Sequence, residues 1–284
     1  MLKAFHLAGI IPIAKNPYDY GFIFDDCLIP IEKNYTAIER SIAECLWAGC
    51  ETIWIVAHRD MQPIIKHCVG ESMVDPLSIR PRVVLSQTVL RDIQIYYVPI
   101  HPKDRRKRDC LAYSVLYGAL SAFMIATRSS RWILPDKYYV SFPWGVFDPE
   151  VVRPFRPKIS SSKNFSFSYE GKTIQDGLMT SFSFSSDDYK KAIKTFRYLS
   201  HNKYFEREEH SKVKFDFSLD KIFKSVIMEN VIELDDFFQI DTWEKYRNYM
   251  STDYTLVKPD FIRPKFWHGI GEQDGDDEET NVPG

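Results

Sequence analysis

The stretch that most constrains the fold is residues 34–57, NYTAIERSIAECLWAGCETIWIVA. Apolar residues recur there at helical spacing, and Asn34 or Thr36 can cap the N–H groups at the start of a helix. Glu39 follows Thr36 by three residues, as a capping box requires, and Gly49 stands where a helix ends in a left-handed turn. The apolar run after it is typical of a strand buried on both faces. Together these signals predict a βαβ unit and a parallel sheet.

The rest of the chain continues this alternation. Residues 3–14 are apolar and predict a buried first strand. Further elements are predicted at 61–70 (helix), 81–86 and 93–100 (strands), 111–126 (helix), 137–143 (strand) and 187–200 (helix). We therefore predict an α/β protein with three layers, α/β/α, and a mixed, mainly parallel sheet of Rossmann-like type.

Changes in composition along the chain predict one domain followed by two C-terminal segments. Residues 1–255 predict one domain, in which the Ser- and Phe-rich stretch 156–215 forms an antiparallel elaboration at the edge of the sheet. Residues 256–271 are expected to wrap the domain. Residues 272–284 hold six acids and no base, which indicates a disordered acidic tail.

Net charge and cysteine content narrow the class of protein. The formal charge is −2, which argues against a general nucleic-acid binder; without the six tail acids, 37 bases face 33 acids, which favours anionic ligands. The five cysteines are odd in number and form no CxxC pair, as expected for reduced thiols. The apolar N-terminal run is too short for a bilayer, and no other window approaches 18 apolar residues. A cytoplasmic protein that does not enter the membrane is the expectation.

Three blocks occur in the order found in one enzyme superfamily. They are CLIPIEKNYTAIERSIAECLWAGCETIWIV at 27–56, KTIQDGLMTSFSFSSDDYKKA at 172–192 and VIELDDFFQIDTWEKYRNYM at 231–250. Over roughly residues 3–250 the chain resembles the nucleotidyltransferase (GT-A-like) superfamily, which includes sugar-nucleotide pyrophosphorylases and cytidylyltransferases. The resemblance implies a three-layer, Rossmann-like nucleotidyltransferase fold.

The resemblance also implies a reaction, the transfer of a nucleotidyl group from a nucleoside triphosphate to a sugar phosphate or similar phosphorylated acceptor. Charge builds on the phosphate oxygens during such a transfer, so backbone N–H groups, Lys or Arg and usually Mg²⁺ are needed. Residues 103–108 hold five bases ahead of a helix, similar to the Arg-x-x-Ser-Val-x-x-Gly segment of cytidylyltransferases, although a solvated basic loop is an equal alternative. The expected site residues are Lys15 and Arg108 at the phosphates (catalytic) and Ala8, Gly9, Ile10, Arg105 and Ser114 in nucleotide binding.

The phosphate-binding loop departs from the family pattern. That loop ordinarily carries several glycines so that its backbone can approach phosphate, whereas residues 8–26 contain only Gly9 and Gly21. The family's Pro-Lys position falls near Asp25 and Asp26, which reverses the charge expected there.

The positions of the metal-binding carboxylates also depart from the family pattern. The position of the family's Gly-Asp turn falls near Trp144 or Gly145. Asp148 and Asp241 are the remaining candidates for Mg²⁺. Their alternatives are a turn residue for Asp148 and a helix N-cap for Asp241.

Two functions follow, and the sequence leaves both open. One is an active nucleotidyltransferase with an unusual metal site. The other is a catalytically degenerate relative that serves as a nucleotide-binding or structural component. The expected partners are a nucleoside triphosphate and a phosphorylated small molecule, and a homo-oligomer is compatible with either function.

Overall fold

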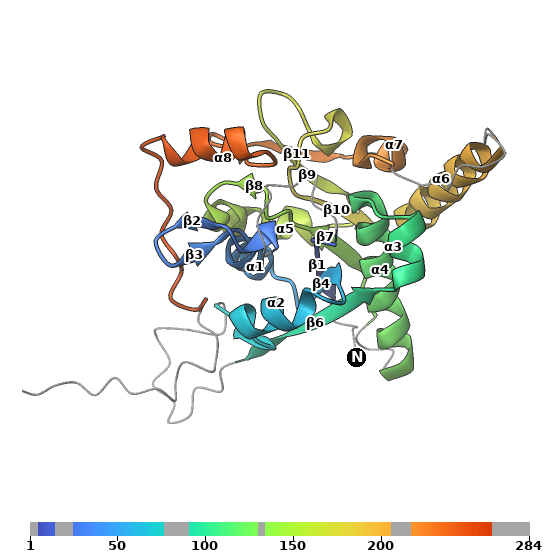
Figure 1. Cartoon of the computed structure of the whole chain (residues 1–284), viewed down its shortest axis with the longest axis horizontal. Helices are drawn as coiled ribbons and strands as arrows, with labels where there is room; N and C mark the ends of the chain where they lie inside the picture. The colour runs from blue at the N-terminus through green and yellow to red at the C-terminus, as the bar shows by residue number, and fades with distance from the viewer. Residues whose placement is uncertain (1–4, 15–24, 77–90, 130–133, 206–216, 263–284) are drawn as a thin grey trace, which may run out of the picture.

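The computed structural model describes residues 5–14, 25–76, 91–129, 134–205 and 217–262. Its centre is an eight-stranded sheet with strand order β11-β9-β10-β7-β1-β4-β6-β5 (Figure 1). These strands are β1 (Leu7–Pro12), β4 (Thr52–His58), β5 (Ser72–Val74), β6 (Asp92–Ile100), β7 (Lys137–Val140), β9 (Phe165–Ser168), β10 (Phe182–Ser185) and β11 (Asn230–Glu233). Two small sheets pair β2 (Pro30–Glu32) with β3 (Tyr35–Thr36), and β8 (Gly145–Val146) with β12 (Phe238–Gln239).

Strand pairing confirms the predicted sheet. β1 runs parallel to both β4 and β7, β4 is parallel to β6, and β11 is parallel to β9. β5 and β10 are antiparallel to their neighbours, so the sheet is mixed and mainly parallel. The predicted strand at 81–86 lies outside the described residues.

Helices join the strands. They are α1 (Ala37–Ala48), α2 (Gln62–Val69), α3 (Pro102–Lys107), α4 (Leu111–Ser129), α5 (Arg156–Ile159), α6 (Ser186–Phe205), α7 (Leu219–Phe223) and α8 (Trp243–Met250), with short 3₁₀ turns η1 (Asp26–Leu28), η3 (Pro149–Phe155) and η4 (Ile174–Asp176). The helices predicted at 61–70, 111–126 and 187–200 correspond to α2, α4 and α6, and are therefore confirmed.

α1 forms as its sequence predicts. Thr36, rather than Asn34, is the cap: its hydroxyl accepts from the Glu39 N–H, and the Glu39 carboxylate accepts from the Thr36 N–H at 2.9 Å. Gly49 ends the helix with φ +87°, and a Cβ there would lie 2.7 Å from the Arg156 guanidinium. The backbone angle therefore favours glycine, and a larger residue would also displace the Arg156 guanidinium.

Helices on opposite faces of β1 make the three layers. A Cβ on Gly9 would lie 3.0 Å from the sulfur of Cys45 on α1. On the other face, a Cβ on Gly118 of α4 would lie 2.9 Å from the Ile10 side chain and 2.8 Å from that of Val56. Glycine thus allows close approach of a helix to the sheet on each side.

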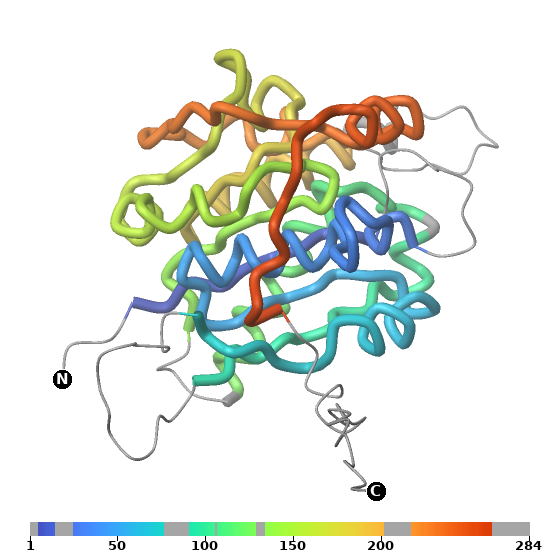
Figure 2. The backbone as a smooth tube through the Cα atoms, turned by 90° about the vertical axis from the view of Figure 1, so that its left-hand side faces the viewer, coloured from blue at the N-terminus to red at the C-terminus, as the bar shows by residue number. Residues whose placement is uncertain are grey.

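The chain after α8 crosses α1 as a strap, residues 253–262 (Figure 2). The Lys258 ammonium lies 2.7 Å from a Glu39 carboxylate oxygen and donates to the Asn34 carbonyl at 2.8 Å. The Phe261 ring meets Trp47 edge-on at 5.2 Å. The remainder of the segment predicted to wrap, and the acidic tail, lie outside the described residues.

Leu111–Arg128 of α4 is, within the described residues, the one helical stretch long and apolar enough to cross a membrane by length and composition. Sequence analysis expected no such window, because tyrosines, serines and a glycine interrupt its apolar residues. Half of the stretch is buried, and Gly118 places it directly on the sheet. This position is that of a core helix.

Candidate functional site

A cleft lies at the carboxyl ends of the neighbouring strands β4 and β6. It has a volume of about 410 Å³ and is lined by Arg59, Asp60, Ile100, Pro102 and Arg105. Arg59 and Asp60 directly follow β4, and Pro102 begins α3 just after β6. Open α/β sheets bind ligands outside the carboxyl ends of their strands, and this volume suits a small molecule.

Two guanidinium groups give the cleft its chemistry. Arg105, on α3, points one nitrogen at both carboxylate oxygens of Asp60, at 3.1 and 3.3 Å. Desolvation raises the pKa of Asp60, but the hydrogen bond and charge of Arg105, a backbone hydrogen bond and the charge of His58 together hold the pKa below its ordinary value. Arg59 is exposed and has no ion-pair partner within the described part of the chain. Within the described part of the chain, one guanidinium is therefore held by an ion pair and the other is not, an arrangement suited to phosphate.

A second polar contact ties β4 to the start of α4. His58, the last residue of β4, shares a hydrogen bond of 3.0 Å with the Asp109 carboxylate. Asp25 is buried nearby, where its carboxylate accepts from the Cys27 N–H at 3.1 Å and caps η1. Burial raises the pKa of Asp25, opposed by that hydrogen bond and by the charge of His58.

The residues predicted to contact phosphate lie in different surroundings. Arg105 lies in the cleft. Arg108 ends α3, with its guanidinium 5.7 Å from the centre of the Tyr113 ring and 3.6 Å from Asp104. Ser114 is fully buried and its hydroxyl donates to the Cys110 carbonyl at 3.3 Å, so its oxygen faces the helix rather than a ligand. Lys15 lies outside the described residues.

Ala8, Gly9 and Ile10 occupy the middle of β1. They pair with β4 on one side and β7 on the other, so their main-chain groups belong to the sheet. The strand continues to Pro12 before it reaches the carboxyl edge. Ile13 and Ala14 follow β1 at the carboxyl edge, where the Ile13 N–H donates to the Val56 carbonyl at 2.9 Å. The main-chain groups of Ala8, Gly9 and Ile10 are engaged on both sides, as in any central strand.

The carboxyl end of β7 is closed by a buried ion pair. Arg40 and Glu44 of α1 are both fully buried, with Nη1 and Oε2 2.9 Å apart. Tyr139 and Ser141 donate to the Glu44 carboxylate, at 2.6 and 2.5 Å, while Arg40 Nη2 donates to the Phe142 carbonyl at 2.8 Å. The pair thus fixes the backbone where β7 ends.

The predicted metal carboxylates are engaged elsewhere. Trp144, at the position of the family's acid, is buried. Asp148 caps η3, since its carboxylate accepts from the Glu150 N–H at 3.0 Å. Asp241 lies 2.7 Å from the Lys245 ammonium, and the neighbouring Thr242 caps α8. The residues that the structure describes contain no group of three His, Cys, Asp or Glu able to hold a metal by themselves.

Comparison with known proteins rests on structure, because no protein-family model and no curated protein sequence matches the chain. A protein assigned as a glucose-1-phosphate thymidylyltransferase of Bacillus anthracis, solved with sucrose, superposes with a TM-score of 0.56 over 89% of this chain and 98% of that one, at 9% identity. A nucleoside-diphosphate-sugar pyrophosphorylase of Vibrio cholerae matches with a TM-score of 0.50 over 86% and 100%, at 14% identity. The chain has the fold of the sugar-nucleotide pyrophosphorylases. The predicted resemblance is thereby confirmed for the fold.

Within this fold, four polar residues in or beside the cleft were not predicted as site residues: His58, Arg59, Asp60 and Asp109. A signal for three of them was present, since they directly follow the apolar run that ends at Ala57. Polar residues just past a buried parallel strand lie at the ligand-binding edge of the sheet. The partner of His58, in contrast, depends on where α4 begins and has no local signal.

Proposed function

We propose that this protein binds a nucleoside triphosphate at the carboxyl ends of β4 and β6 and transfers its nucleotidyl group to a sugar phosphate or a similar phosphorylated acceptor. The observation that carries the proposal is the cleft with Arg59 and Arg105, at the ligand-binding edge of a sheet with the pyrophosphorylase fold. Guanidinium groups bind phosphate oxygens in pairs of hydrogen bonds and keep their charge at every physiological pH.

The chain's own residues supply binding and orientation in this proposal. Asp60 holds Arg105 in place before a ligand arrives, which reduces the entropy lost on binding. Arg59 is free to move onto a phosphate. Mg²⁺ would enter with the triphosphate, as its counter-ion.

The proposal is tested by a thermal-shift panel of the four nucleoside triphosphates and common nucleotide sugars, each with and without Mg²⁺. A ligand at 100 times its Kd stabilises the native state by about 2.7 kcal/mol. We expect a rise in Tm with one base, lost in Arg59→Ala. Pyrophosphate release with that triphosphate and a panel of sugar 1-phosphates then reports transfer. If no nucleotide raises the Tm, the proposal is wrong.

A second function, nucleotide binding without transfer, has its own support. Buried Trp144 stands where the family resemblance places a metal-binding acid, and Asp241 is paired with Lys245. Each lost group that stabilises transition-state charge costs about 2.7–4 kcal/mol of activation free energy. A nucleotide-dependent rise in Tm without pyrophosphate release would favour this function over transfer.

The cysteines support a reducing compartment. All five are free, and four of them are buried. We propose the cytoplasm as the location of this activity, with small phosphorylated molecules as its partners.

A further inference from the structure

Arg105 lines the cleft from a short helix that depends on the residue just before it. α3 has only six residues, and helices of this length are not stable on their own. The His101 carbonyl accepts from the Asp104 N–H at 2.8 Å and from the Arg105 N–H at 3.0 Å. Ile100 and Pro102, on either side of His101, line the cleft. His101 therefore joins the cleft wall to the helix that carries Arg105.

The side chain of His101 is the N-cap of α3. Its Nδ1 atom accepts a hydrogen bond from the Lys103 N–H at 3.1 Å. Most helices are capped instead by a side-chain oxygen of Ser, Thr, Asp or Asn, which accepts at any pH near neutrality. An imidazole nitrogen accepts only while it carries no proton, so this cap requires the neutral ring with its proton on Nε2. Because imidazoles ordinarily titrate at about pH 6.5, a histidine in this position makes the cap sensitive to pH.

The charges near His101 do not offset a proton on its ring. A cation at the start of a helix is destabilising, because the N–H groups there already carry partial positive charge. The charged groups in the first turns of α3 and on the facing wall of the cleft are Lys103, Asp104, Arg105, Arg59 and Asp60. Each of the two carboxylates already forms an ion pair with an arginine, at 3.6 and 3.1 Å. Protonation of His101 therefore removes the acceptor of the cap and adds a cation at the positive end of α3.

We propose that His101 is a positioning residue for phosphate binding: its neutral imidazole caps α3 and so holds Arg105 at the cleft, and its protonation weakens binding. The inference rests on the proposed function, since it requires that the cleft binds phosphate groups. Two contacts fix Arg105 in the ligand-free protein. Its guanidinium is held by Asp60 at 3.1 and 3.3 Å, and its backbone by the first turn of α3. Loss of the cap loosens the second contact, so Arg105 must be ordered again when a phosphate binds.

Direct contact between His101 and phosphate predicts the opposite dependence on pH. An imidazolium attracts phosphate, so the affinity would then rise as the pH falls, and replacement of His101 would remove that rise. The geometry favours the cap, because Nδ1 is already engaged by the Lys103 N–H. The sign of the pH effect separates the two roles.

The experiment is isothermal titration of the full chain with inorganic triphosphate and Mg²⁺ at about pH 5.5 and about pH 8, on either side of the range in which imidazoles titrate. His101→Asn keeps an acceptor that no proton blocks, whereas His101→Ala has none. At the higher pH we expect wild type and His101→Asn to bind alike and His101→Ala to bind about three- to tenfold more weakly. At the lower pH wild type should fall to the affinity of His101→Ala, while His101→Asn stays about three- to tenfold tighter. Comparison at equal pH cancels the protonation of the triphosphate itself.

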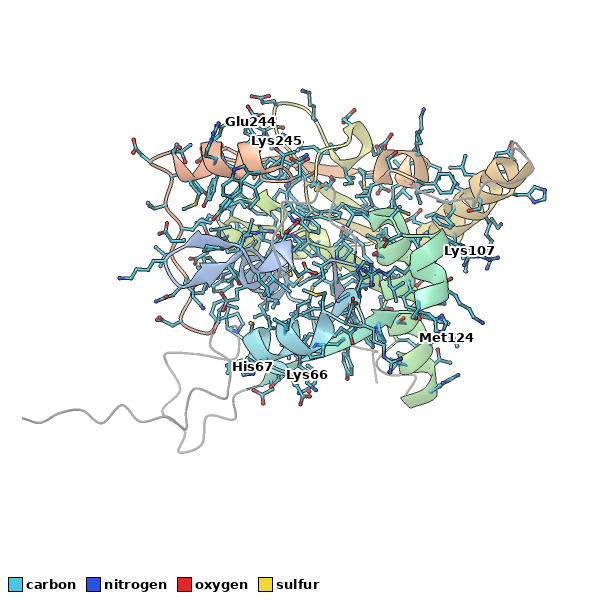
Figure 3. All side chains as sticks on the ribbon, in the orientation of Figure 1. Lys66, His67, Lys107, Met124, Glu244 and Lys245 are labelled. Atoms are coloured by element: carbon cyan, nitrogen blue, oxygen red, sulfur yellow. The ribbon has the colours of Figure 1, made fainter. Side chains whose placement is uncertain are left out.

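His67→Asn is the matched control. His67 is exposed on α2 and lies in a different part of the molecule from Lys107 of α3 (Figure 3), so this variant should bind as wild type does at both pH values. A His101→Asn variant that binds more weakly than wild type at the lower pH overturns the proposal and identifies His101 as a phosphate ligand. Equal affinities of wild type, His101→Asn and His101→Ala at both pH values also overturn it.

A measurement without ligand separates this proposal from the proposed function. The chemical shift of the Lys103 amide proton, followed by NMR on the ligand-free chain over the same pH range, should titrate in wild type and stay constant in His101→Asn. A Lys103 amide that does not titrate in wild type overturns the proposal even if triphosphate binds. A titrating amide in a chain that binds no triphosphate at either pH shows that the proposed function is wrong, and overturns the effect on binding while confirming the cap.

Discussion

The carboxyl ends of β4 and β7 lie on either side of β1 in one sheet and have opposite chemistry. The end of β4 opens into a cleft where Asp60 and Arg105 face water. The end of β7 is sealed by the fully buried pair Arg40 and Glu44. Both ends contain an arginine and a carboxylate about 3 Å apart, at 3.1 and 2.9 Å. The comparison indicates that the burial of an ion pair, and not its presence, determines whether its charges are available to a ligand or stabilise the fold.

The energies of the two pairs differ for the same reason. An exposed ion pair is screened by water and contributes about 0–1 kcal/mol to the free energy of unfolding. Removing one partner of a buried pair leaves an uncompensated charge in a low-dielectric interior and costs about 3–5 kcal/mol. Arg105 is therefore available for a ligand at little structural cost, whereas Arg40 is committed to the fold.

The largest expected effect comes from Arg40→Met. The substitution leaves the Glu44 carboxylate buried without its cation and should lower the free energy of unfolding by about 3–5 kcal/mol. Urea denaturation measures it. A decrease in the free energy of unfolding below about 1 kcal/mol would contradict the conclusion that this ion pair holds the backbone at the end of β7.

Arginine substitutions in the cleft should act on binding. Hydrogen bonds to charged groups contribute about 1.5–3 kcal/mol, so Arg59→Ala and Arg105→Ala should each weaken nucleotide binding roughly 10- to 100-fold. Isothermal titration with the triphosphate that raises the Tm measures this loss. Arg128→Ala, an exposed arginine at the far end of α4, is the control and should leave the Kd unchanged. If all three variants bind alike, the ligand occupies another part of the sheet edge.

The buried carboxyl group of Asp25 predicts how the free energy of unfolding depends on pH. Burial raises the pKa of Asp25, so the folded state holds its proton more tightly than the unfolded state, whose pKa is about 3.8. Between 3.8 and the raised value, the free energy of unfolding should therefore fall as the pH rises. Asp25→Asn keeps an acceptor for the Cys27 N–H and removes the charge.

We expect the advantage in stability of Asp25→Asn over wild type to grow as the pH rises above about 3.8 and to level off above the raised pKa. Thermal unfolding of both proteins across that range gives the difference, which cancels the titration of all other carboxylates. A variant that loses stability relative to wild type as the pH rises would show that the Asp25 carboxylate is stabilised, not destabilised, by the fold.

The smallest effect is expected from Arg105→Met, the same chemical change as Arg40→Met at the open strand end. Its pair with Asp60 is about half exposed, so the free energy of unfolding should change by less than about 1 kcal/mol. Urea denaturation beside Arg40→Met sharpens the comparison directly. Similar losses for the two variants would show that the cleft pair also supports the fold.

The parts of the fold that the sequence predicts are those with local physical causes. The capping box at Thr36 and Glu39, the left-handed turn at Gly49 and the apolar run of β4 each follow from neighbouring residues. The order of the strands is different, because it depends on which distant segments pair. The resemblance over residues 3–250 implied the type of fold, a mixed and mainly parallel sheet, but no strand order was predicted.

The candidate site was predictable only in part. Arg105 was predicted from its basic run and lines the cleft, but its partner Asp60 lies 45 residues earlier and is brought there by the parallel pairing of β4 with β6. Ser114 was expected at a ligand, yet helical geometry turns its hydroxyl onto the Cys110 carbonyl one turn before. The sequence shows that Trp144 replaces the family's carboxylate after β7. It gives no sign of the Arg40–Glu44 ion pair that closes the end of this strand.

Two tyrosines of α8 donate hydrogen bonds to the backbone of β2, and this contact affects the order in which the chain can fold. Tyr246 donates to the Pro30 carbonyl across 216 positions of sequence, and Tyr249 donates to the Ile31 carbonyl across 218. At a synthesis rate of 5–20 residues per second, Pro30 leaves the ribosome about 10–40 seconds before Tyr246 exists. During that interval the β2–β3 hairpin lacks a partner that its carbonyl groups have in the finished protein. The β2–β3 hairpin can therefore complete its native hydrogen bonds only after nearly the whole domain has been made.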